Sequence, residues 1–158
     1  PIYTVYGNMK TVLAWTYEKV TPETAIGLTD SSDTEETNLK FEVRVGGKGA
    51  EFAQNPELWI LSVHNREAGY IVGRVFNRKK KLMYNTQIQG VVKVFGYDKT
   101  PQLYTYPKGV KGSTFWDETF AISDVLPNPE GSSYHLIIGD REIEVKVQAG
   151  KVTYINLK

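Results

Sequence analysis

Short β-forming runs separated by turn residues extend along the whole chain, and this pattern constrains the fold more than any other feature. Residues 41–45 alternate apolar and charged side chains before Gly46-Gly47, and residues 134–138 precede the turn pair Gly139-Asp140. No segment keeps a helical period over about eleven residues, although residues 56–61 could form one short helical turn. The pattern therefore predicts an all-β chain.

The expected strands combine β-branched or aromatic residues with polar or glycine-containing flanks. They lie at residues 3–6, 11–15, 41–45, 70–76, 88–95, 103–106, 134–138, 143–147 and 152–157. The last two flank Ala149-Gly150-Lys151, which predicts a closing hairpin. A polar stretch without strand patterning, residues 62–68, predicts a linker between a first β-rich part, residues 1–61, and a second, residues 69–158.

The charge balance and the missing residue types exclude several classes of function. Nineteen basic and eighteen acidic residues give a net charge of +1, so the charge gives no reason to expect nucleic acid as a partner. Cysteine is absent, which excludes disulfides and thiol catalysis. No apolar run approaches the roughly 20 residues that span a bilayer, so membrane insertion is not expected. The chain begins at Pro1 without methionine, which suggests a processed terminus or a fragment.

The second part of the chain resembles a known β-sandwich family. Residues 73–76, 88–94, 120–127 and 134–138 follow in the family's order, and residues 145–153 match its last hairpin. This order is similar to that of the carboxypeptidase regulatory-like, transthyretin-like domains. The resemblance implies a transthyretin/Ig-like β-sandwich that acts as an accessory or adhesion module. The insertion at residues 128–133 departs from the family's tight turn.

The first part carries the pattern of a second family. Residues 38–44 read Asn-Leu-Lys-Phe-Glu-Val-Arg and soon reach Asn55-Pro56, and residues 3–8 read Tyr-Thr-Val-Tyr-Gly-Asn. These stretches resemble the closing strands of the lysostaphin-type (LytM-like) zinc endopeptidases, which cut peptidoglycan. The resemblance implies a truncated antiparallel peptidase-like sheet over residues 1–61.

The family's catalytic histidines are missing from the matching positions. The resemblance places Asn8, Asn38 and Lys40 where the histidines would lie, and the two other zinc ligands would lie upstream of Pro1. An ammonium group at Lys40 would repel a zinc ion, and without the metal the attacking water keeps its high pKa. The chain is therefore expected to be a pseudoenzyme without zinc, and an active zinc-dependent peptidoglycan endopeptidase is the least favoured function.

A sheet that lacks part of its strands exposes unpaired edges, which must be covered or paired. The preferred hypothesis is therefore a secreted or cell-surface structural protein. Its copies would assemble into a filament or tube through edge strands of residues 1–61. The alternative is a monomeric accessory module that binds a cell-wall glycan or peptide.

Exposed aromatic side chains would serve that alternative, and the ligand-binding candidates are Tyr104, Tyr106 and Trp116. Tyr104 and Tyr106 are expected to share one strand face and one environment. Aromatic residues of β-proteins pack more often in the core, and that interpretation is favoured for a wider set. This set comprises Trp15, Trp59, Tyr97, Tyr104, Tyr106 and Trp116.

Other polar groups have ordinary explanations. An acidic loop could supply oxygen ligands to calcium, although a solvated turn explains it equally well. The candidate ligands are Asp30, Asp33, Glu35 and Glu36. His64 and His135 are expected to have structural roles, and the basic run 78–81 is expected to be a solvated hairpin tip. No cofactor is expected, and calcium is the one ion that this acidic loop could hold.

Overall fold

The computed structural model describes residues 1–29, 39–60, 64 and 66–158. Its elements are β-strands and three single-turn 3-10 helices, which confirms the all-β prediction. One of these turns, η2 (Pro56–Leu58), lies where a short helical turn was expected. The chain divides into two compact units, unit 1 (Pro1–Pro56) and unit 2 (Glu57–Lys158), so unit 2 begins before the linker expected at residues 62–68.

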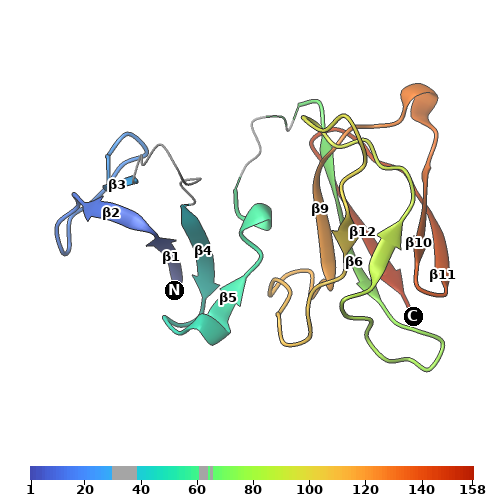
Figure 1. Cartoon of the computed structure of the whole chain (residues 1–158), viewed down its shortest axis with the longest axis horizontal. Helices are drawn as coiled ribbons and strands as arrows, with labels where there is room; N and C mark the ends of the chain where they lie inside the picture. Colours follow the sequence, from blue (N-terminus) through green and yellow to red (C-terminus); the bar gives the residue numbers. More distant parts are fainter. Residues whose placement is uncertain (30–38, 61–63, 65) are drawn as a thin grey trace. The chain divides into compact units, whose positions relative to one another are not determined.

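Unit 1 consists of a three-stranded sheet and a two-stranded ribbon. In the sheet, β1 (Ile2–Gly7) pairs antiparallel with β4 (Lys40–Val45), and β4 pairs with the two-residue β5 (Ala53–Gln54), which follows η1 (Ala50–Phe52). In the ribbon, β2 (Met9–Val12) pairs with β3 (Gly27–Thr29) (Figure 1). The second strand expected in this part, 11–15, therefore starts two residues earlier and ends three residues earlier.

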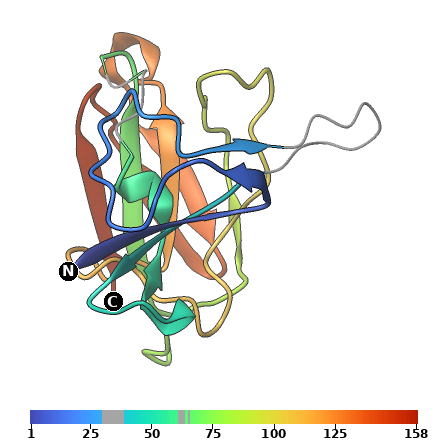
Figure 2. The ribbon, with the colours of Figure 1, turned by 90° about the vertical axis from the view of Figure 1, so that its left-hand side faces the viewer.

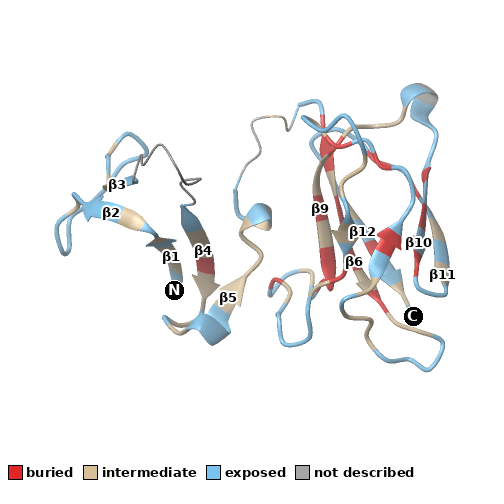
Figure 3. Ribbon diagram, in the orientation of Figure 1, coloured by how far each residue is buried: buried red, intermediate tan, exposed pale blue. Residues whose placement is uncertain are grey.

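The described part of unit 1 has almost no hydrophobic core. Val43 on β4 is its single buried hydrophobic residue, at 2% exposure. Figure 3 shows the buried colour of this unit only on β4. Because small domains depend on apolar burial for stability, the described residues of unit 1 contribute little stability of this kind.

Unit 2 is a sandwich of two sheets. One has the strand order β12 (Val152–Leu157), β6 (Gly69–Val75) and β9 (Phe120–Val125). The other has the order β11 (Arg141–Val145), β10 (Tyr134–Ile138), β7 (Gln87–Gln89) and β8 (Leu103–Tyr104). Figures 1 and 2 show β12, β6 and β9 side by side. The 3-10 turn η3 (Pro129–Gly131) lies in the loop before β10.

Both sheets contribute side chains to one core, in which Ile71, Phe120, Leu136 and Ile138 are fully buried. Gly73 on β6 is required for this packing. A Cβ atom on Gly73 would lie 2.3 Å from the ring of Phe120, so the ring occupies the space that glycine leaves open. The core thus explains the apolar alternation of these strands.

The pairing of the last strand differs from the closing hairpin that the sequence predicted. β11 pairs with β10 across the Gly139-Asp140 turn, and β12 pairs parallel with β6, in the register Val152↔Tyr70 to Leu157↔Val75. The Ala149-Gly150-Lys151 turn therefore carries the chain from one sheet to the other. The hairpin prediction was wrong because a turn sequence does not determine which sheet receives the next strand.

The continuous strand expected at residues 88–95 was also wrong. The strand ends at Gln89, and Gly90 adopts φ +133°, where a Cβ atom would lie 2.4 Å from the carbonyl oxygen of His135. Beyond this point, Val94 forms only an isolated bridge with Val125. Glycine here bends the chain close to β10 and interrupts the strand.

The remaining polar predictions have clear structural counterparts in unit 2. The basic run 78–81 is an exposed turn whose backbone N–H groups at Lys79 and Lys81 each donate to Asn77 Oδ1 at 3.0 Å. His64 stacks on Phe95 with ring centroids 3.6 Å apart, and His135 pairs with Glu142 at 2.6 Å. Among the described residues, no helix is long and apolar enough to cross a membrane.

Candidate functional site

The outer edge of β1 is the first candidate interaction surface. Among the described residues β1 pairs only with β4, so it is an edge strand of its sheet. Its sequence, Ile2 to Gly7, contains no charged residue and no proline, which are the usual protections of an exposed edge. By contrast, β11 at an edge of unit 2 carries Arg141, Glu142 and Glu144. The β1 edge is therefore open to pairing.

An apolar face accompanies this edge. Residues paired directly across an antiparallel sheet lie on the same face, and the register joins Ile2 to Val45 and Tyr6 to Phe41. The rings of Tyr6 and Phe41 have centroids 5.2 Å apart, and Ile2 is 58% exposed. Thr4, opposite Val43, is the only polar residue that β1 places on this face. We call this surface the β1–β4 face.

Two of the three positions that the family resemblance assigned to lost histidines lie at one end of this strand pair. Lys40 is paired with Gly7, and Asn8 follows directly at φ +61°. The third position, Asn38, lies outside the described residues, as do the calcium candidates Asp30, Asp33, Glu35 and Glu36. In the described part of the chain, no three His, Cys, Asp or Glu side chains are grouped to hold a metal ion.

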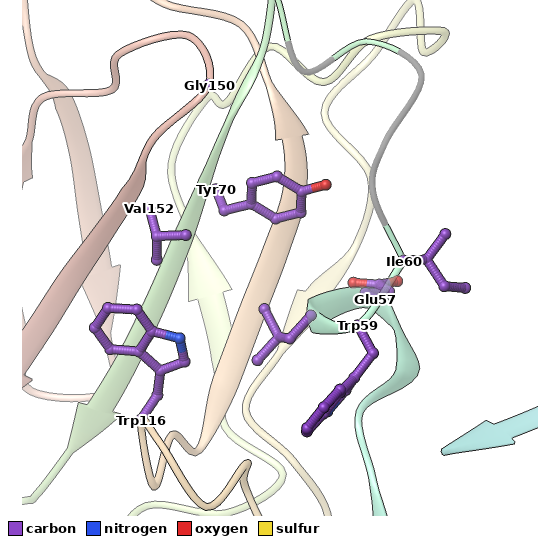
Figure 4. Close-up of a pocket in the computed structure, with 8 residues that line it drawn as sticks. Glu57, Trp59, Ile60, Tyr70, Trp116, Gly150 and Val152 are labelled. Carbon is purple, nitrogen blue, oxygen red and sulfur yellow. The ribbon is translucent and has the colours of Figure 1, made fainter. Parts of the chain in front are cut away.

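An open pocket of about 350 Å³ lies on the outer face of the β12–β6 pair in unit 2. Parallel pairing sets Tyr70 of β6 beside Val152 of β12, and the segment from Glu57 to Ile60 faces them (Figure 4). The indole rings of Trp59 and Trp116 flank the pocket. We call it the aromatic pocket, and its complete lining is Glu57, Leu58, Trp59, Ile60, Tyr70, Trp116, Gly150 and Val152.

Trp116 is held in place from two sides. Its ring stacks on Tyr154 of β12, with centroids 5.4 Å apart and planes 28° apart, and Phe115 contacts it edge-on at 4.7 Å. The backbone N–H of Trp116 donates to Ser113 Oγ at 3.1 Å. An indole that is already stacked, on a residue whose backbone is hydrogen-bonded, loses little conformational freedom when a ligand binds it.

The loop that carries Trp116 is anchored by a buried carboxylate. Glu118 is 2% exposed and accepts hydrogen bonds from the backbone N–H of Ser113 at 2.9 Å and from Ser113 Oγ at 2.8 Å. The hydroxyl of Tyr106 donates to the other carboxylate oxygen at 3.3 Å. Next to it, Asp117 forms an ion pair with Arg74 of β6. These contacts fix the loop on the outer face of the sheet.

The structure separates the three residues that the sequence proposed as ligand contacts. Trp116 lines the aromatic pocket, Tyr106 supports the loop through Glu118, and Tyr104 is 50% exposed on β8 of the other sheet. Tyr104 and Tyr106 therefore do not share one environment, because β8 ends at Tyr104.

The prediction that the six aromatic residues pack in the core was wrong for those that are exposed. Trp15 is 82% exposed, and Trp59, Tyr97 and Tyr104 are also exposed. Sequence reasoning missed the aliphatic walls of the pocket, Leu58, Ile60 and Val152, and it missed Tyr70. Only the parallel β12–β6 pairing brings these residues together, and no local sequence signal announces that pairing.

Comparison of the chain with protein-family models, with curated proteins and with solved structures gives no match.

Proposed function

We propose that this chain is a non-catalytic structural subunit that associates with further copies of itself through unit 1. The observation that carries the proposal is the combination of an unprotected β1 edge with a sheet that buries one hydrophobic side chain. A second copy would cover the edge by strand pairing, and it would place the apolar side chains of the two β1 strands next to one another on one continuous sheet face.

Antiparallel pairing of two β1 strands is compatible with the strand's composition. β1 has no charged side chain, so pairing with its own copy places no like charges opposite each other. A two-fold contact joins two copies only, so growth into a filament or tube needs a second contact. The β2–β3 ribbon offers one through Leu28, which is 54% exposed.

The non-catalytic part of the proposal rests on the resemblance to LytM-like endopeptidases. Under that resemblance Asn8, Asn38 and Lys40 replace histidines, and a lysine ammonium does not bind a zinc ion as a neutral imidazole does. An extracellular or cell-surface location belongs to the same proposal, because it rests on the same resemblance.

Light scattering and electron microscopy on the purified chain and on Thr4→Lys test the association. The substitution places a charge at the centre of the β1 edge, where Thr4 is exposed and paired with Val43. We expect the wild type to form oligomers that grow with concentration and Thr4→Lys to stay monomeric. Val91→Lys, on an exposed position of unit 2, is the matched control and should assemble like the wild type. A monomeric wild type, or equal assembly by Thr4→Lys, would refute the proposal.

A further inference from the structure

The aromatic pocket of unit 2 combines ring faces with aliphatic side chains and few polar groups. Trp59 is 40% exposed, so its ring is available to a ligand, and Trp116 presents its ring from the opposite side (Figure 4). Leu58 and Val152 add aliphatic surface, and Glu57 adds a carboxylate. A mostly apolar pocket with a small number of polar groups is the usual form of a small-ligand site.

Trp116 also supplies a hydrogen-bond donor. Its indole N–H has no acceptor among the described residues, and Figure 4 shows the ring nitrogen on the side that faces the other pocket residues. An indole N–H usually finds a partner when it is covered. A ligand that covers Trp116 must therefore bring an acceptor with it.

We propose that the aromatic pocket binds a neutral oligosaccharide whose pyranose rings carry equatorial hydroxyl groups. Such a ring has axial C–H bonds on both faces, which pack flat on an indole, and hydroxyl groups at its rim. One hydroxyl oxygen accepts from the Trp116 N–H, while another hydroxyl donates to the Glu57 carboxylate. The ligand thus matches both the apolar and the polar groups of the pocket.

Two other ligand classes fit the observations less well. An apolar peptide side chain would cover Trp116 without giving its N–H an acceptor, which costs free energy. A quaternary ammonium ion has no acceptor either, so it would also cover Trp116 and leave its N–H unpaired. The volume of about 350 Å³ lies at the lower end for ligand pockets, which suits a sugar unit and not a folded partner.

Isothermal titration calorimetry of the full chain with cellotetraose and chitotetraose tests the proposal, because both probes have equatorial substituents on every ring. We expect at least one of them to bind. Trp59→Ala and Trp116→Ala should each weaken that binding about tenfold or more, whereas Tyr104→Ala, an exposed aromatic residue on the other sheet, should leave it unchanged. A melting curve for each variant shows whether it is folded, and Trp59→Ala, which removes an exposed side chain, keeps the test valid if Trp116→Ala unfolds.

The proposal is overturned if neither probe binds at millimolar concentration, if the tryptophan variants bind like the wild type, or if Tyr104→Ala weakens binding equally. A β-1,4-linked galactotetraose has an axial C4–O bond on each ring and should bind more weakly, and equal affinity would contradict stacking on a flat ring face. The proposal does not depend on self-association. Thr4→Lys should therefore keep the wild-type affinity, which separates failure of this proposal from failure of the assembly proposal.

Discussion

Single residues in unit 2 show how buried polar groups are satisfied. Glu118 is buried, and its carboxylate accepts hydrogen bonds from the backbone N–H and the hydroxyl of Ser113 and from the hydroxyl of Tyr106. A carboxylate has only acceptors to offer, which matches the two Ser113 donors. The position of the loop that carries Trp116 therefore depends in part on Glu118, alongside the Asp117–Arg74 ion pair.

Glu118→Gln tests this dependence. An amide turns one acceptor into an N–H donor that faces the donors of Ser113, so we expect unit 2 to lose about 1–3 kcal/mol of unfolding free energy. Urea denaturation followed by tryptophan fluorescence measures the loss. Glu144→Gln, on an exposed position of β11, is the matched control and should change stability very little. Equal stability of the two variants would show that the buried carboxylate does not hold the loop.

Tyr134 gives a prediction about pH. Burial raises the pKa of its phenol above the ordinary value, and a hydrogen bond with the backbone of Lys93 offsets only part of this effect. The unfolded chain therefore releases the proton at a lower pH than the folded chain. The protonated phenol of Tyr134 therefore contributes to the free energy of unfolding. This contribution is complete below the pKa of about 10 that the phenol has in the unfolded chain, and it is lost as the pH rises through the pKa that it has in the folded chain.

Melting temperatures measured between about pH 8 and pH 12 check this prediction, because this range brackets the ordinary pKa of tyrosine. Tyr134→Phe loses the hydrogen bond to the carbonyl oxygen of Leu126, made at 2.6 Å, so its melting temperature should be lower at neutral pH. Its alkaline decline should nevertheless be shallower than that of the wild type. Parallel curves would mean that Tyr134 does not titrate differently in the two states.

At the scale of elements, the edge strand β1 is uncharged, as the edge strand β12 also is, and its exposed side includes Ile2 and Tyr6. Ile2 tests whether this side contributes to association. Ile2→Ser removes an exposed apolar side chain from the β1–β4 face. We expect the dissociation constant of the assembly to rise about tenfold or more. Sedimentation velocity over a concentration series measures the change. Ile137→Ser, an exposed isoleucine on β10 of unit 2, should have no effect, and a similar change in both variants would contradict a role for β1.

Local sequence patterns predicted the strands well and their partners poorly. The alternation at residues 41–45 predicted β4, and the Gly139-Asp140 turn marked the boundary between the strands β10 and β11, because both signals are local. The parallel β12–β6 pair and the strand break at Gly90 depend on contacts far apart in the chain. The aromatic pocket follows from that pairing, so the sequence indicated Trp116 and not its neighbours.

At the scale of the whole molecule, the two units differ in how much apolar surface they bury. Nearly all described buried hydrophobic side chains belong to unit 2. A fragment of residues 57–158 should therefore unfold cooperatively, whereas residues 1–56 alone should show a stable fold only at concentrations where they associate. Circular dichroism melts of the two fragments over a concentration series check this. A concentration-independent, cooperative melt of residues 1–56 would mean that unit 1 is complete by itself.

Strand pairing between copies is the central claim, and hydrogen exchange of the β1 backbone amides tests it most directly. The exchange of the full chain is measured at a low and a high protein concentration, with the amides of β6 and β10 as internal references. We predict that exchange in residues 2–7 slows markedly at high concentration, because pairing protects the N–H groups on the open edge of β1, while β6 and β10 stay unchanged. Exchange in β1 that is the same at both concentrations would contradict the account.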